Sequence, residues 1–176
     1  PGRVILAGAS AGAHLAMAAA FTQGQPAFEG APVTKTSRVV AVVEQYGPSD
    51  FLRIHEQFDA SGYPRSYDPE AVSSVDRLLG VRARDIPNLM RFVSPIHLVH
   101  PDIPPVLIQH GRHDPIFPYQ QAAELFEKIL AVCGPGRAEL DLSETYTHAD
   151  PGYADPESVE KILAFLDRVV PGMGKR

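Results

Sequence analysis

A strand, a sharp turn and a helix follow one another within residues 4–16, and this succession constrains the fold more than any other feature. The unbroken apolar run Val4–Ala7 predicts a buried strand, and the alanine-rich stretch after it predicts a helix. Between them lies Gly8-Ala9-Ser10-Ala11-Gly12, the G-x-S-x-G pattern. A serine on such a turn is held in strained backbone geometry with its hydroxyl exposed. Ser10 is therefore a candidate nucleophile; the alternative is a glycine-rich turn with a buried serine.

The turn and its flanking elements are expected to be closely packed. We expect both Gly8 and Gly12 to be required, because no Cβ fits where the strand and helix backbones approach each other. The helix from about Ala11 to Phe21 is apolar almost all round, which predicts deep burial. Val4–Ala7 is apolar on both faces, which predicts a strand covered by helices on both sides. Free N–H groups at the helix N-terminus would face an anion formed beside Ser10.

Size and composition limit the class of protein. At 176 residues the chain is sized for one domain, and we treat residues 1–176 as a single unit. A net charge of −5 argues against a nucleic-acid or anionic-membrane partner, and no apolar run is long enough for a membrane span. The single cysteine, Cys133, excludes an internal disulfide and fits a reducing compartment.

Strands and helices alternate along the chain, which predicts a mostly parallel sheet in a three-layer α/β/α fold. Further strands are predicted at residues 39–43, 105–111 and 140–146. The last of these alternates apolar and polar residues and is expected at a half-exposed edge of the sheet. Helices are predicted from Pro118 to the glycines at 134–136 and, after an N-cap at Asp155, over residues 156–170.

Residues 51–100 lose this periodicity. Helices are predicted there only from Pro69 to Leu79 and near Pro87–Phe92. An irregular stretch of this length inside a compact domain is usually functional. We interpret it as an insertion that forms a lid or a substrate wall.

The loops after the third and fourth strands are the expected positions of partners for Ser10, because function collects beyond the carboxyl ends of parallel strands. An activated serine needs a general base, and that base needs an orienting acid. Asp114 follows the third strand, and His148 is the only histidine on the loop after the fourth. The chain order Ser10, Asp114, His148 is the one expected on this architecture. We therefore predict a hydrogen bond between Asp114 and His148.

Other interpretations of these loops stay open from the residues alone. Asp114 could be a turn or helix-capping aspartate, in which case Asp150 is the next acid to consider. His110, at the end of the third strand, is interpreted as a structural hydrogen-bonding residue. A metal site formed by His110, His113 and Asp114 is a further alternative, although no additional ligand is evident nearby.

The chain resembles the α/β-hydrolase superfamily, and most closely its esterase and lipase branch, which includes acetyl-xylan, feruloyl and hormone-sensitive-lipase-like esterases. The segments that carry the resemblance are 8–16, 46–50, 94–96, 104–118 and 148–151. The resemblance implies Ser10 as nucleophile, His148 as base, Asp114 as orienting acid and the backbone N–H of Ala11 as one oxyanion donor. It also implies a small-molecule ester as substrate, with no cofactor and no metal.

The chain departs from the family pattern before Ser10. The family fold has several further strands there, with a glycine-rich loop that supplies the remaining oxyanion N–H groups. The sequence therefore looks like the carboxyl-side half of a hydrolase, and we expect the edge of Val4–Ala7 to pair with an upstream segment or another chain. An ester hydrolase acting through an acyl-enzyme is the favoured function. An arylformamidase, a peptidase and a truncated non-catalytic domain are the alternatives.

Overall fold

The structure of the protein is a computed structural model that describes residues 3–28 and 38–172. Its sheet has four parallel strands, ordered as they occur along the chain. They are β1 (Arg3–Ala9), β2 (Arg38–Gln45), β3 (Val106–Gly111) and β4 (Ala138–Ser143). The apolar and β-branched runs that predict these strands are the ones that form them. The predicted parallel α/β architecture is confirmed.

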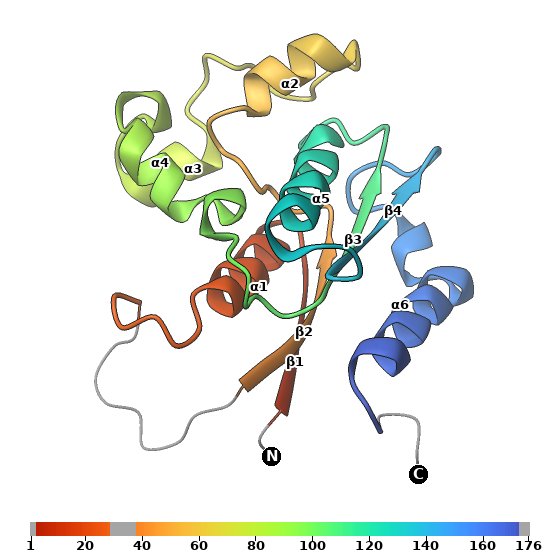
Figure 1. Ribbon diagram of the computed structural model, residues 1–176. Coiled ribbons are helices and arrows are strands. Elements are labelled where there is room, and N and C mark those ends of the chain that lie inside the picture. Colours follow the sequence, from red (N-terminus) through yellow and green to blue (C-terminus); the bar gives the residue numbers. More distant parts are fainter. Residues whose placement is uncertain (1–2, 29–37, 173–176) are drawn as a thin grey trace.

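Helices cover both faces of the sheet and produce three layers (Figure 1). On one face lie α1 (Ala11–Phe21) and α5 (Gln120–Cys133), and on the other lies α6 (Pro156–Val169). The predicted N-cap of α6 is confirmed, because the Asp155 carboxylate accepts the backbone N–H of Ser158 at 2.8 Å.

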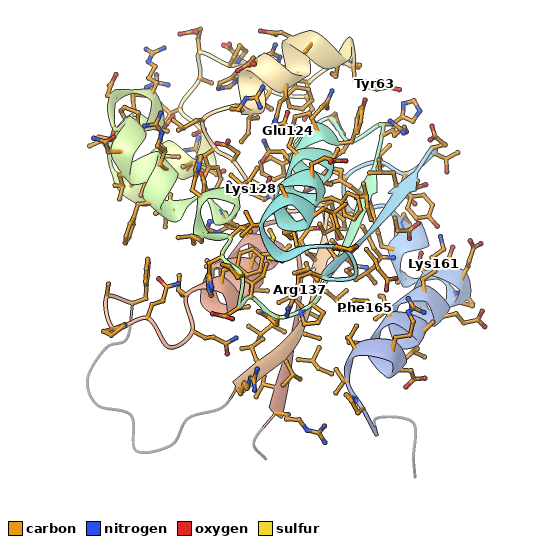
Figure 2. All side chains as sticks on the ribbon, in the orientation of Figure 1. Tyr63, Glu124, Lys128, Arg137, Lys161 and Phe165 are labelled. Atoms are coloured by element: carbon orange, nitrogen blue, oxygen red, sulfur yellow. The ribbon has the colours of Figure 1, made fainter. Side chains whose placement is uncertain are left out.

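Each face of the sheet has its own hydrophobic core. Under α1 and α5, the fully buried Met17, Phe21 and Ile129 belong to one cluster with Ile108 of β3. Under α6, Phe165 is 1% exposed and packs in a second cluster with residues of β2 and β3 (Figure 2). Burial of apolar surface on both faces fixes the sheet and therefore the positions of the loops that leave it.

The fourth strand differs from its predicted range. β4 begins earlier, at Ala138, and ends at Ser143. Tyr146 therefore lies in the loop, where its backbone and ring occupy the space that side chains at Gly111 and Gly152 would need. β4 is half-buried at the edge of the sheet, as its alternating pattern predicts.

The insertion, residues 51–100, lies beyond the carboxyl end of the sheet (Figure 1). It contains α2 (Ile54–Ser61), α3 (Ser74–Leu79) and α4 (Pro87–Val93). The prediction of one helix over residues 69–79 was too long, because α3 starts after a capping box formed by Ser73 and Asp76. The helix α2 was not predicted, since its short polar sequence has no apolar stripe long enough to identify it.

The predictions of deep burial for β1 and α1 were wrong in part. β1 is an edge strand whose side chains are half-buried or exposed. The helix α1 buries one face only, and Leu15 on its other face is 65% exposed. Ala11, Gly12 and Ala19 are exposed beside Leu15. An apolar helix face and an open strand edge therefore lie next to each other.

Among the residues that the structure describes, no helix combines the length and apolar character needed to cross a membrane.

Candidate active site

Ser10 lies at the tight turn between β1 and α1. Its backbone has φ 54° and ψ −122°, a strained conformation for a residue with a side chain, and its N–H donates to the Gln45 carbonyl at 2.9 Å. A Cβ on Gly8 would overlap the carbonyl group of Gly12, so glycine is required at position 8. A Cβ on Gly12 would meet nothing, so the expectation that both glycines are required was wrong for Gly12.

Three side chains from three loops meet at the carboxyl end of the sheet. His148 Nε2 lies 3.0 Å from Ser10 Oγ, and His148 Nδ1 lies 2.7 Å from Asp114 Oδ2. The structure therefore brings together the three residues selected from the sequence, and the predicted hydrogen bond between Asp114 and His148 is present. We call these three residues the triad.

Asp114 is held firmly in its position. It is 1% exposed, and its Oδ1 accepts the backbone N–H groups of Ile116 and Phe117 at 2.8 and 2.9 Å. Burial by itself raises the pKa of Asp114, but hydrogen bonds from His110 and His148 outweigh it and lower the pKa to about 2. Asp114 is therefore a carboxylate at neutral pH, which suits the orientation of an imidazole.

The alternatives considered for these loops fit the structure less well. Asp150 caps the short 3-10 helix over Pro151–Ala154 and accepts the Gly152 N–H at 3.0 Å, so its position is explained locally. His113 is exposed and packs its ring edge-on against Tyr63. Within the ranges 3–28 and 38–172, no three His, Cys, Asp or Glu side chains are grouped so as to hold a metal ion.

Two aromatic rings hold the His148 imidazole and were not predicted as part of the site. Tyr46 contacts it edge-on with ring centroids 4.9 Å apart, and Phe117 does so at 5.7 Å. Tyr46 has φ 45°, which directs the chain sharply away from β2. A sequence signal for Tyr46 existed in the turn Tyr46-Gly47-Pro48, which follows the second strand at the same edge as the triad.

A cavity of about 380 Å³ lies between the insertion and the loop after β3. Phe117 belongs both to its wall and to the surroundings of His148, so the cavity adjoins the triad. Most of its wall is apolar, and the Tyr67 hydroxyl is buried without a hydrogen-bond partner among the described residues. Lining residues from the insertion include Phe51, Ile54, Tyr67, Val72 and Met90.

One backbone donor is available beside Ser10. Ala11 is the first residue of α1, where an N–H has no partner within its own helix. Its N–H forms no other backbone hydrogen bond in the part of the chain that the structure describes. Ala11 is thus free to donate to an oxygen that becomes negative next to Ser10.

Comparison with known protein families identifies the chain. The family model described as BD-FAE matches residues 1–129. The chain belongs to the BD-FAE family. Three parallel strands, the insertion and two members of the triad, Ser10 and Asp114, lie within the matched residues, while His148 lies beyond them.

Curated relatives of this BD-FAE chain are named as esterases. Esterase LipC of Mycobacterium tuberculosis is 33% identical over 131 residues, which cover 73% of this chain and 30% of LipC. The probable carboxylic ester hydrolase LipM of the same organism is 29% identical over 134 residues, covering 75% and 29%. The BD-FAE chain therefore spans about 30% of the length of these relatives.

Solved structures confirm the α/β-hydrolase fold of the BD-FAE chain. A truncated carbohydrate esterase from gut microbiota superimposes with a TM-score of 0.73 at 24% identity, covering 92% of this chain and 57% of that one. The propionate-bound esterase Est2 of Thermogutta terrifontis gives 0.65 at 21% identity, covering 95% and 56%. At these identities the likeness concerns the fold alone.

Proposed function

We propose that this chain carries the catalytic triad of a serine carboxylic-ester hydrolase, in which Ser10 is the nucleophile, His148 the general base and Asp114 the orienting acid. The observation that carries the proposal is the continuous hydrogen-bonded path from Ser10 Oγ through the His148 ring to the buried Asp114 carboxylate. The two contacts lie within the range required for proton transfer between these groups. The esterase names of the relatives support the same reaction class.

In this proposal, Ser10 Oγ attacks the ester carbonyl while His148 Nε2 takes the hydroxyl proton. Asp114 stabilises the imidazolium through Nδ1–H, and Ala11 N–H donates to the oxyanion. Collapse of the tetrahedral intermediate breaks the ester C–O bond, and His148 returns its proton to the departing alcohol. Water then adds to the acyl-enzyme with His148 again as base, and the acid is released as Ser10 regains its proton.

We propose that the cavity under residues 51–100 receives the acyl or alkoxy group of the substrate, so the insertion is a substrate wall within a single catalytic domain. Its apolar lining favours short-acyl or aryl esters over charged ones. The carbohydrate esterase with the same fold makes an esterified carbohydrate a reasonable substrate to include in tests.

We further propose that the functional sheet extends past β1 through an upstream segment or a partner chain. The half-buried strand β1 and the exposed apolar face of α1 around Leu15 lie at the same side of the molecule. Open strand edges and contiguous apolar faces are normally covered. A segment placed there would also be positioned to add oxyanion donors to Ala11.

The first prediction tests the nucleophile. Ser10→Ala is expected to lower ester hydrolysis by several orders of magnitude and to abolish labelling by a fluorophosphonate, while the circular dichroism spectrum is unchanged. Ser66→Ala, an exposed serine elsewhere in the chain, serves as control. Turnover of Ser10→Ala above a tenth of wild type would refute the proposal. A panel of ester, anilide and formamide substrates separates an esterase from a peptidase or an arylformamidase.

A further inference from the structure

A second pair of titratable side chains is buried directly behind the triad. Glu44, in β2, is 1% exposed, and His110, in β3, is 0% exposed. Glu44 is opposite Ile108 in the parallel register, and His110 follows Ile108 by two residues on the same strand. The two side chains therefore lie on the same face of adjacent strands. Neither has a role in the chemistry proposed above.

His110 contacts the triad. Its Nε2 lies 3.0 Å from the Phe117 carbonyl oxygen and 3.4 Å from Asp114 Oδ2. Both neighbours accept hydrogen bonds, so Nε2 must carry a proton. The other ring nitrogen, Nδ1, is buried and has no hydrogen-bond partner in the described part of the chain.

Glu44 supports the turn that holds Ser10. Its Oε1 accepts the backbone N–H of Gly47 at 2.6 Å, and Gly47 lies so close to Ser10 and Ala13 that a Cβ there would contact both. Its second oxygen, Oε2, is buried and without a partner among the described residues. A carboxylate in this position needs a nearby positive charge, since burial of an isolated ion is very unfavourable.

The charges of the two groups influence each other. Burial raises the pKa of Glu44 to about 7, and the charge of His110 opposes this rise. Burial lowers the pKa of His110, but the carboxylates of Asp114 and Glu44 outweigh burial, so that the pKa is raised overall. The remaining titratable groups nearby are His148, beyond Asp114, and Tyr153, whose pKa is raised by burial and by the charges of Asp114 and Glu44.

We propose that Glu44 and His110 form a buried ion pair, and that His110, as an imidazolium, is a positioning residue that holds Asp114 in its anionic form. The triad then continues inward as Ser10, His148, Asp114, His110 and Glu44. His110 faces the same Asp114 oxygen that binds His148 Nδ1. Its positive charge disfavours a second positive charge on His148, which keeps His148 neutral, and available as a base, down to lower pH.

The protonation of His110 can be measured without any activity. In the wild-type chain at about pH 8, nitrogen-15 NMR of the histidine side chains is expected to show protons on both His110 ring nitrogens. In Glu44→Gln, which preserves the side-chain shape and the Gly47 contact, His110 is expected to lose its Nδ1 proton. A wild-type His110 with one protonated nitrogen would overturn the proposal, and this reading stands even if the variant does not fold.

Kinetics provide a second readout, which rests on the proposed ester hydrolysis. For Glu44→Gln, the acid-side midpoint of kcat/KM is expected to rise by about half a pH unit, a roughly threefold loss at low pH. KM at about pH 8 stays unchanged. A merely structural role would lower activity equally at all pH values, and that result, or an unmoved midpoint, would overturn the proposal. Glu160→Gln, exposed on α6, is the matched control.

Failure of this proposal and failure of the proposed function give different results. If the protein hydrolyses no ester and its Ser10 does not react with a fluorophosphonate, the proposed function fails while the NMR spectrum still reports the ion pair. If hydrolysis is normal and His110 is neutral, only the ion pair is wrong.

Discussion

Backbone strain in this protein is concentrated at individual residues around the triad. Among the described residues, Ser10, Tyr46 and Ala149 are the non-glycine residues with positive φ. Ser10 is itself a triad member, Tyr46 packs on the His148 ring, and Ala149 follows His148 in the chain. Such conformations are unfavourable by about 1–3 kcal/mol each and persist only where the surrounding structure requires them. Their grouping supports a site that was shaped for chemistry rather than for stability.

At this scale the second prediction concerns the orienting acid. Asp114→Asn keeps the shape of the side chain but favours the wrong His148 tautomer, so kcat is expected to fall by about 10⁴-fold. Asp150→Asn, on the same side of the sheet, is expected to change kcat by less than about threefold, because Asp150 caps a short helix. Steady-state kinetics on one ester substrate compare the two. Equal losses in both variants would contradict the assignment of Asp114.

The third prediction follows from the pKa of Asp114. Its value of about 2 in the folded protein is below the usual value, so its stabilising contribution is complete above about pH 4 and is lost as pH falls toward 2. Between about pH 5 and 2, the free energy of unfolding of the wild type is expected to drop by about 2 kcal/mol more than that of Asp114→Asn. Denaturant titrations at several pH values measure this difference. Parallel curves for the two proteins would show that Asp114 is not depressed.

The triad could be predicted from the sequence, whereas the pair behind it could not. Ser10, Asp114 and His148 each follow a strand, and in a parallel sheet this places them at one edge. Glu44 adjoins an apolar run that predicts a strand ending at Val43, and nothing local shows that the strand continues into a buried acid. The contact of His110 with Asp114 depends on the tight turn after β3, which local sequence does not define.

At the level of elements, the turn from β1 to α1 makes the fourth prediction. Gly8→Ala introduces a Cβ that overlaps the Gly12 carbonyl, so we expect a loss of several kcal/mol in the free energy of unfolding or a failure to fold. Gly12→Ala adds the same methyl group where nothing lies within 4 Å, and it is expected to be neutral or slightly stabilising. Thermal unfolding of the two variants decides. Similar melting temperatures would contradict the packing of this turn.

The elements themselves were predictable to different degrees. Strands β1 to β3 and helices α1, α5 and α6 follow from long apolar runs with clear stop signals. Within residues 51–100 the helices are short and mostly exposed, so tertiary contacts and caps determine their limits. The Ser73–Asp76 capping box is a sequence signal that could have corrected the start of α3. Burial of α1 was overestimated because apolar composition alone does not say what covers each face.

On the scale of the whole molecule, the exposed apolar side formed by β1 and α1 is the main unsatisfied feature. Leu15 is 65% exposed there, at the centre of a helix face with no polar side chain. Contiguous apolar surface of this kind promotes association in water. The arrangement supports a functional protein in which further polypeptide covers this side.

The fifth prediction tests that surface. Residues 1–176 expressed alone are expected to self-associate and to hydrolyse esters poorly, since loss of even one oxyanion donor lowers the rate by about 10²–10³-fold. Leu15→Lys is expected to reduce the association measured by light scattering. Leu78→Lys, at a leucine that is 82% exposed on α3, is expected to have a smaller effect. A monomeric, fully active wild-type chain would contradict the requirement for a covering segment.

The sheet order β1-β2-β3-β4 has a consequence for the order of refolding. Each strand pairs with the one before it along the chain, so the sheet can grow one unit at a time from short-range contacts. Ser10 and His148, however, are 138 positions apart and meet only after β4 has docked. Recovery of fluorophosphonate reactivity during refolding should therefore lag behind recovery of helical circular dichroism, so that the nucleophile reports the final docking event.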